Sequence, residues 1–330
     1  MIITRAPNRI SLLGGGTDYP NWFKEHGGLV IGGAIDKYSF ILCKKSSEFL
    51  NYKYKLVYSD TEVTNDIDEI NHRAIKSTLE FVKQKDGLEI VHASDLFGKC
   101  GLGSSSTFLV SLLHALSEYN RLDTRKVALA RNAIYIEQEM MKDSVGCQDQ
   151  IFAAYGGFNR IYFHKDGTFD ILAVTNNQAI IEKLQNNLML FFTGVYRMAS
   201  DIAKTYVPNL TKMEDIQKTM HSLAEDACYK IYHGNIDSVG PLMHEGWQQK
   251  RRLSPNISKD EIDKMYETAL SAGATGGKLT GAGGGGCLLL YVPDKSQQRV
   301  REALSGLTEI RFKFDFEGSR VVFNESRNIS

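Results

Sequence analysis

The chain has 330 residues, of which 42% are hydrophobic and 24% are charged, as is typical of a globular protein with room for two domains. Its 39 basic and 39 acidic residues balance, so no basic field indicates a nucleic acid or an anionic membrane as a partner. The longest apolar runs, such as residues 188–192, are too short to cross a bilayer. Five cysteines without a C-x-x-C pair, and a start without a signal-peptide pattern, predict reduced thiols and a cytoplasmic protein.

The hydrophobic pattern predicts a mixed α and β fold without internal repeats. Strands are expected over residues 28–44, 51–58, 156–163, 188–193 and 287–292. Helices are expected over residues 70–85, 108–120, 124–140, 213–234 and 258–271. In the last of these, Ser258 and Glu261 are predicted to form a capping box and Gly273 to end the helix. We place a domain boundary near residue 180.

Three glycine-rich stretches follow one another, at residues 7–18, 101–106 and 278–286. Glycine lets backbone N–H groups approach an anion closely, and a following helix adds its positive N-terminal end. One such stretch is a weak signal, because tight turns also need glycine. Three of them, together with the triplet Gln148-Asp149-Gln150, predict a protein that handles a phosphorylated ligand.

The middle stretch has the context of a phosphate-binding loop. A strand-like run at residues 88–92 precedes it, and the hydroxyl groups of residues 104–107 can then cap a helix. The apolar residues of that helix share one face: Leu109, Leu112, Leu113 and Leu116. The stretch has neither the ending of a Walker loop nor the Rossmann spacing. A capped helix after a tight turn is the alternative interpretation.

The order of these motifs resembles that of the GHMP kinases, the superfamily that includes galactokinase, homoserine kinase and mevalonate kinase, and the resemblance covers nearly the whole chain. It implies an α+β fold of two domains with the active site between them. The first, at residues 1–180, is an ATP-binding domain like part of ribosomal protein S5, and the second, at residues 181–330, is ferredoxin-like. The form Gly14-Gly15-Gly16-Thr17-Asp18, with residues 145–150 and 244–250, is most similar to the D-glycero-D-manno-heptose 7-phosphate kinase branch. Fucokinase-like members share the triple glycine.

Phosphoryl transfer needs an aligned acceptor hydroxyl, a neutralised triphosphate and a base for the hydroxyl proton. By the resemblance, Asp149 is that base and Arg9 is the cation that keeps its carboxylate ionised. A turn-forming role for Asp149 and a surface position for Arg9 are the alternatives. The residues implied to bind ATP and its phosphates are Gly101, Gly103, Ser104, Ser105, Ser106, Thr280, Gly281, Ala282 and Gly283.

ATP and Mg²⁺ are the implied cofactors, and Mg²⁺ prefers oxygen ligands. By its position in the motif, Ser105 is the expected hydroxyl ligand. The expected carboxylate is Glu137 rather than Glu139, because Glu137 follows Ala130 and Ile134 on the inward face of its helix. A buried ion pair is the alternative role for Glu137.

The implied contacts of the sugar are Gly16, Thr17, Asp18 and Asp149, with an N-cap or turn role as the alternative for Asp18. A phosphate already present on the sugar needs basic partners, for which arginine is best suited. The candidates are Arg197 and the cluster at residues 250–252. For this cluster, a solvated basic patch is the alternative.

These implications predict an ATP-dependent kinase that phosphorylates the anomeric C1 hydroxyl of D-glycero-D-manno-heptose 7-phosphate to the 1,7-bisphosphate, in nucleotide-heptose synthesis. A fucokinase-like kinase of an unphosphorylated sugar is one alternative, and a sugar- and ATP-binding sensor without turnover is another. The expected partner is the sugar or sugar phosphate, with neither nucleic acid nor membrane. A homodimer is compatible with the sequence, which does not determine the oligomeric state.

Overall fold

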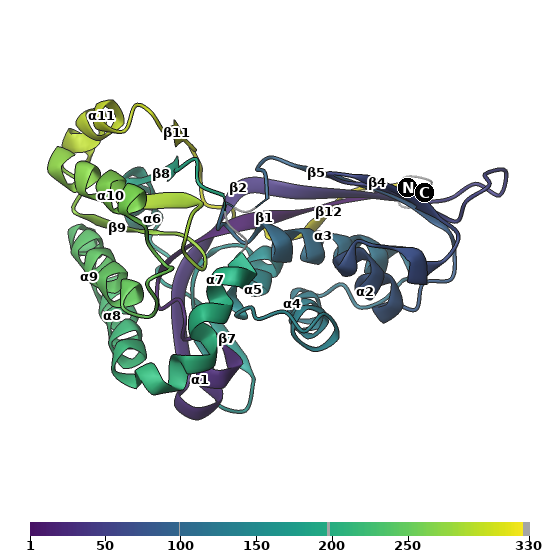
Figure 1. Ribbon diagram of the computed structural model, residues 1–330, viewed down its shortest axis with the longest axis horizontal. Helices are drawn as coiled ribbons and strands as arrows, with labels where there is room; N and C mark the ends of the chain where they lie inside the picture. Colours follow the sequence, from purple (N-terminus) through teal and green to yellow (C-terminus); the bar gives the residue numbers. More distant parts are fainter. Residues whose placement is uncertain (99, 197–198, 326–330) are drawn as a thin grey trace.

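The computed structural model describes residues 1–98, 100–196 and 199–325, and two β-sheets organise it (Figure 1). The larger sheet has the strand order β12-β1-β2-β5-β3-β4, and β6 and β7 extend it beside β2. Its strands are β1 (Ile2–Leu13), β2 (Gly28–Lys45), β3 (Tyr54–Val57), β4 (Thr61–Thr64), β5 (Leu88–Ser94), β6 (Phe158–Phe163), β7 (Phe169–Ala173) and β12 (Arg320–Asn324). The long strands β1 and β2 run from the termini to the second half of the molecule (Figure 1).

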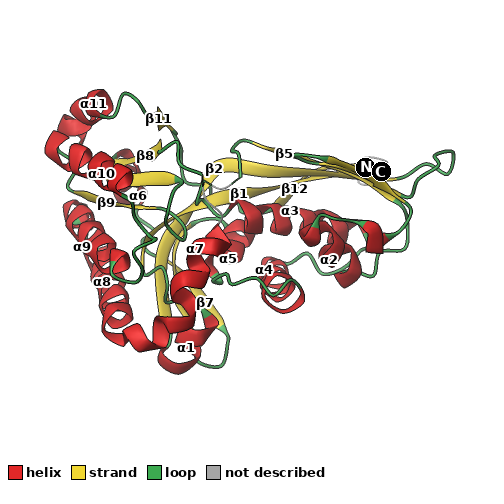
Figure 2. Cartoon of the chain, viewed as in Figure 1, coloured by secondary structure: helices red, strands yellow, loops and turns green. Residues whose placement is uncertain are grey.

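Helices from the first half of the chain pack on one face of this sheet (Figure 2). They are α2 (Arg73–Phe81), α3 (Ser104–Tyr119), α4 (Lys126–Tyr135) and α5 (Gln148–Tyr155). A π-helical turn, Ile136–Met140, continues α4, and α1 (Pro20–His26) and a 3₁₀ turn, Ile67–Glu69, are shorter. The predicted apolar face of α3 is buried in the core, with Leu109, Leu112, Leu113 and Leu116 at 0% exposure.

The smaller sheet contains β8 (Leu188–Phe192), β9 (Gly276–Leu279), β10 (Cys287–Tyr291) and β11 (Thr308–Glu309). Its order, β11-β8-β10-β9, is that of a ferredoxin-like sheet, as expected. The helices of this half are α6 (Gln178–Asn186), α7 (Ala199–Tyr206), α8 (Glu214–Tyr232), α9 (Val239–Arg251), α10 (Asp260–Ala272) and α11 (Asp294–Ala303), with 3₁₀ turns at Val207–Met213 and Ile236–Ser238. No helix in the described ranges is long and apolar enough to cross a membrane.

The division between the halves falls at α6, close to residue 180, but the chain crosses it twice. Strand β12 returns to the larger sheet and pairs with β1, so the C-terminal strand does not belong to the second half, where we had placed it. A shared hydrophobic cluster includes Leu12 and Ile31 from the larger sheet and Leu190 and Leu289 from the smaller one. Because both sheets contribute to one core, the loops of one sheet are held in a fixed position relative to the loops of the other.

Two predictions about helix starts are wrong. Helix α3 begins after Gly103, which has a left-handed φ of 78°, and no side chain caps it. Two hydroxyl groups near its start bond to distant partners instead, Ser106 to Glu137 and Thr107 to the Pro7 carbonyl. Helix α10 also lacks a side-chain cap, because Ser258 donates to Asp263. Gly273 ends α10 with a φ of 113°, as predicted.

Candidate active site

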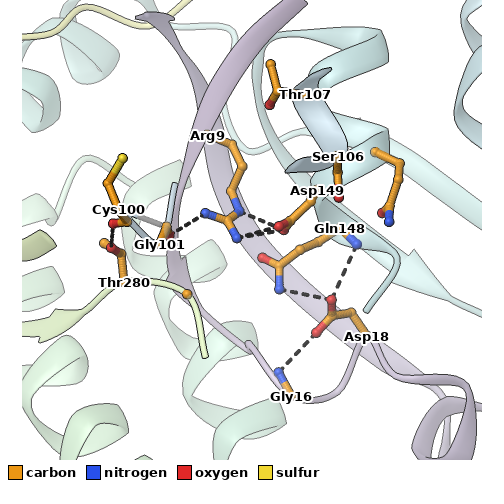
Figure 3. Close-up of polar contacts among 12 residues, drawn as sticks. Arg9, Gly16, Asp18, Cys100, Gly101, Ser106, Thr107, Gln148, Asp149 and Thr280 are labelled. Atoms are coloured by element: carbon orange, nitrogen blue, oxygen red, sulfur yellow. Dashed lines mark hydrogen bonds and ion pairs between the residues drawn. The ribbon is translucent and has the colours of Figure 1, made fainter. Parts of the chain in front are cut away.

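Arg9 and Asp149 form an ion pair where the first glycine-rich stretch meets the start of α5 (Figure 3). Arg9 donates from Nε to Oδ1 at 2.8 Å and from Nη2 to Oδ2 at 2.7 Å, and its Nη1 donates to the Gly101 carbonyl at 2.9 Å. The Arg9 side chain is 5% exposed and that of Asp149 is 24% exposed. This bidentate contact is a charge-assisted pair that fixes the carboxylate in place and leaves it accessible to a ligand. The predicted pairing of these two residues is confirmed.

Asp18 supplies a second carboxylate near Asp149, and it is buried. It accepts hydrogen bonds from Gly16 N at 3.0 Å, from Gln148 Nε2 at 2.9 Å and from Gln148 N at 3.3 Å (Figure 3). Burial raises the pKa of Asp18, and the charge on Asp149 adds to the increase. The bond to Gly16 is the turn contact that was the alternative for Asp18. The bonds to Gln148 tie the same carboxylate to the helix that carries Asp149.

Thr17 has a structural role that its motif position did not predict. Its hydroxyl donates to the Gly14 carbonyl at 2.8 Å and to the Leu29 carbonyl at 3.0 Å, and the residue is fully buried. The side-chain hydroxyl is therefore not available to the sugar, and the expected contact of Thr17 with the sugar stays a prediction. The N–H of Gly16 is likewise taken by Asp18. Of the three residues expected from this stretch, Asp18 keeps the free acceptor capacity of a carboxylate.

A substitution at Gly146 would displace the Asp18 carboxylate while Asp18 itself stays unchanged. A Cβ added to Gly146 would lie 2.0 Å from Asp18 Oδ2. We expect Gly146→Ala to displace this carboxylate and to lower kcat/KM for the sugar by about 10²-fold, the usual cost of misplacing a contact by about 1 Å. The dissociation constant for MgATP should stay near that of the wild type.

Steady-state kinetics with each substrate varied in turn checks this expectation. Gly306→Ala is the matched control, because an added Cβ there would have no atom within 4 Å. Equal kinetics for the two variants would show that the position of Asp18 does not affect catalysis.

The second and third glycine-rich stretches pack against each other and present free N–H groups. The Thr280 hydroxyl bonds to the carbonyls of Cys100 at 3.3 Å and Cys287 at 3.0 Å, and the Thr280 N–H donates to Cys287 O at 2.9 Å. Thr280 therefore joins the loops and has no donor left for a phosphate, contrary to expectation. The N–H groups of residues 101–106 and 281–283 donate to no backbone carbonyl of the described chain. Such groups at the start of the 16-residue helix α3 can bind an anion.

Glu137 is buried and faces the start of α3. The Ser106 hydroxyl lies 3.0 and 2.9 Å from its two oxygens, and Gln150 Nε2 also donates to it. Burial raises the pKa of Glu137 to about 7 despite these bonds. The side chain of Glu139 is 60% exposed and pairs with Lys142. The predicted inward position of Glu137 is confirmed.

The hydroxyl group beside Glu137 belongs to Ser106 and not to Ser105, which is exposed. Successive residues of a helix point about 100° apart, so Ser105 does not contact Glu137, and its expected role as a metal ligand stays a prediction. A carboxylate and a hydroxyl oxygen side by side fit Mg²⁺, which completes its shell with phosphate oxygens and water. The described residues hold no larger group of His, Cys, Asp or Glu side chains suited to a metal.

The basic residues expected to bind a sugar phosphate have different environments. Arg197 lies outside the described residues. Within the cluster at residues 250–252, Arg251 pairs with Asp263 at 2.8 Å and Arg252 donates to Gln249 at 2.6 Å. Lys250 is buried, so the solvated-patch interpretation does not apply to it. A second buried lysine, Lys278, and the buried Gln217 were not predicted to have a role in the site.

An ion-paired carboxylate beside glycine loops with free N–H groups is the arrangement of a phosphotransferase. The sequence matches the GHMP kinases N terminal domain over residues 71–157 and the GHMP kinases C terminal domain over residues 224–307. The chain belongs to the GHMP kinases.

Individual relatives agree with this assignment. The chain is 26% identical to D-glycero-alpha-D-manno-heptose 7-phosphate kinase of Campylobacter jejuni, over 92% of this chain and 93% of that protein. It is 26% identical to the bifunctional fucokinase/GDP-fucose pyrophosphorylase of Arabidopsis thaliana, over 93% of this chain and 31% of that protein. Its fold is similar to the crystal structure of a D-glycero-D-manno-heptose 1-phosphate kinase from Bacteroides thetaiotaomicron, with a TM-score of 0.81 and 21% identity over 98% of this chain and 99% of that one.

Proposed function

We propose that this kinase transfers the terminal phosphate of ATP to the anomeric C1 hydroxyl of D-glycero-D-manno-heptose 7-phosphate. The observation that carries the proposal is the Arg9–Asp149 ion pair, with bonds of 2.7 and 2.8 Å. It provides an accessible carboxylate for an acceptor hydroxyl beside the second carboxylate, Asp18. The Campylobacter and Bacteroides relatives are both named as kinases of heptose phosphates, which supports a phosphorylated heptose as substrate.

In this proposal Asp149 receives the proton of the acceptor hydroxyl. The hydroxyl oxygen then forms a bond to the terminal phosphorus, the bond between that phosphorus and the bridging oxygen breaks, and ADP leaves with the electron pair. Arg9 stabilises the carboxylate and the negative charge that develops on the acceptor oxygen. Asp18 accepts hydrogen bonds from the other hydroxyl groups of the sugar and so orients it.

The free N–H groups of residues 101–106 and 281–283 would hold the phosphates of ATP. Glu137 and Ser106 would hold Mg²⁺, which neutralises charge on the triphosphate. A metal held by one carboxylate and one hydroxyl needs phosphate oxygens to complete its shell. We therefore expect it to bind together with the nucleotide.

The test is phosphate transfer from ATP to a panel of sugars and sugar phosphates, with NMR locating the new phosphate. We expect D-glycero-D-manno-heptose 7-phosphate to have the highest kcat/KM and the product to be the 1,7-bisphosphate. The 26% identity to the fucokinase relative keeps fucose in the panel. A preference for an unphosphorylated sugar would replace the heptose 7-phosphate proposal with the fucokinase-like one. Binding of sugar and ATP without turnover of any member would favour a sensor.

A further inference from the structure

Two buried lysines without a carboxylate partner lie near the candidate active site, Lys278 beside the first glycine-rich stretch and Lys250 beside the third. Lys278 of β9 and Lys250 of α9 are 5% and 6% exposed. Lys278 Nζ donates to the Leu12 carbonyl at 3.3 Å, and Lys250 Nζ donates to the carbonyls of Leu279, at 3.4 Å, and Gly281. Neither forms an ion pair with a carboxylate of the described residues. A buried ammonium group without such a partner is costly, so its presence requires an explanation.

The electrostatic environment shows that these cations lie close to one another and to the catalytic pair. Burial and the charges on Lys278 and Arg9 lower the pKa of Lys250 well below its ordinary value. Burial and the charge on Arg9 lower the pKa of Lys278 to about 7. The charge on Asp18 acts in the opposite direction on both lysines. A bound anion would favour the protonated form of both lysines and would offset the lowering of their pKa values by burial.

Unpaired polar atoms surround the same place, next to the triple glycine. A Cβ added to Gly15 would lie 3.7 Å from Ser11 Oγ and 3.9 Å from Lys278 Nζ. A Cβ added to Gly16 would lie 3.0 Å from Gln217 Nε2. The Ser11 hydroxyl and both amide atoms of Gln217 are buried and have no hydrogen-bond partner among the described residues. Buried polar groups are almost always paired, so these atoms point to a ligand that bonds to them.

We propose that Lys278 and Lys250 form a phosphate subsite on the acceptor side, which binds the phosphate monoester that the sugar already carries. This inference rests on the proposed function, because it takes the acceptor to be a sugar phosphate. An ammonium group offers three donors to phosphate oxygens. The unpaired Ser11 and Gln217 side chains would bond to the phosphate or to the adjoining hydroxyl groups. The terminal phosphate of ATP has similar chemistry, so the experiment must separate the two sources.

The experiment measures binding to the wild type, Lys278→Met and Lys250→Met by calorimetry. The probes are D-glycero-D-manno-heptose 7-phosphate, the same heptose without phosphate, MgATP and inorganic phosphate. We expect each variant to bind the heptose 7-phosphate about 10- to 100-fold more weakly, the loss that follows from removing a charged hydrogen bond. Binding of the unphosphorylated heptose and of MgATP should be nearly unchanged, and inorganic phosphate should no longer compete with the heptose 7-phosphate. Lys295→Met, which removes an exposed lysine of α11, is the control and should behave as the wild type.

Thermal unfolding without ligand separates a binding role from a structural one. Because methionine removes the free-energy cost of burying an ionisable amine, we expect Lys278→Met to raise the Tm while it weakens binding. A lower Tm with unchanged binding would overturn the proposal, as would equal losses for both sugars. A loss confined to MgATP would also overturn it, and would assign the lysines to the terminal phosphate of ATP. Lys250→Met tests the same prediction independently if Lys278→Met does not fold.

The outcome for the subsite can be distinguished from the outcome for the proposed function. If the wild type binds inorganic phosphate through Lys278 but does not phosphorylate the heptose 7-phosphate, the subsite is supported and the proposed substrate is wrong. If the wild type phosphorylates the heptose 7-phosphate and both variants bind it unchanged, the substrate is supported and the subsite is wrong.

Discussion

Asp149→Asn is expected to reduce kcat by about 10²- to 10⁴-fold, the usual contribution of a general base. Asparagine has the shape of aspartate but cannot take the proton of the acceptor hydroxyl. Arg9 keeps its bond to the Gly101 carbonyl, so we expect the loop to stay in place and the dissociation constant for MgATP to change little. Single-turnover kinetics together with nucleotide titration measures both quantities.

Asp143→Asn is the control for this variant. It removes a carboxylate from the loop before α5 whose partner is Arg73, at 3.1 Å, and it should leave turnover near that of the wild type. If Asp149→Asn turned over within a few-fold of the wild type, Asp149 would not be the base. The acceptor proton would then pass to solvent or phosphate, with Arg9 supplying most of the stabilisation.

Glu137→Gln is expected to raise the Mg²⁺ concentration needed for half-maximal activity by at least about 10- to 100-fold. Mutation of a residue that only hydrogen-bonds to a metal ligand already lowers metal affinity by that factor. The amide can still bond to Ser106 but lacks the negative charge that attracts the metal. A Mg²⁺ titration at saturating ATP measures the effect. Glu139→Gln, at an exposed residue paired with Lys142, is the matched control and should not change the requirement. Equal shifts in the two variants would exclude Glu137 as the ligand.

The same variant should change how stability depends on pH. Burial raises the pKa of Glu137 from the ordinary value of 4.5 to about 7, so the folded protein holds this proton more tightly than the unfolded chain. The contribution of this group to the free energy of unfolding is therefore full below pH 4.5 and is lost as the pH rises through about 7. Without metal, we expect Glu137→Gln to be more stable than the wild type above pH 7. Chemical denaturation at pH 5 and pH 8 measures the difference in free energy of unfolding between the variant and the wild type. If this difference does not grow with pH, burial of Glu137 is not the cause of the pH dependence.

The parts of the site that local sequence determines were predicted well. The order of the glycine-rich stretches carries the resemblance to the GHMP kinases, and this resemblance implied the fold and the pairing of Arg9 with Asp149. Helix periodicity placed Glu137 inward and Glu139 outward, because residues three and seven positions apart share a helix face. The strands and helices that were predicted lie within a few residues of observed elements, because hydrophobic spacing is local. Other elements were not predicted, among them strand β1 and helices α6, α9 and α11.

The tertiary structure alone decided which polar groups have partners. Ser105 and Ser106 are equivalent in the motif, and the distant Glu137 selects Ser106. Thr17 and Thr280 were expected to meet ligands, but backbone carbonyls from other segments use their hydroxyl groups. In the sequence Lys278 is the ordinary first residue of a glycine-rich stretch. Only the folded chain brings its Nζ to the Leu12 carbonyl of β1 and buries it without a carboxylate partner. A hydrogen bond or an unpaired charge depends on atoms a few ångströms apart in space, and the folded chain brings these together from distant positions, 266 residues apart for the bond from Lys278 to Leu12.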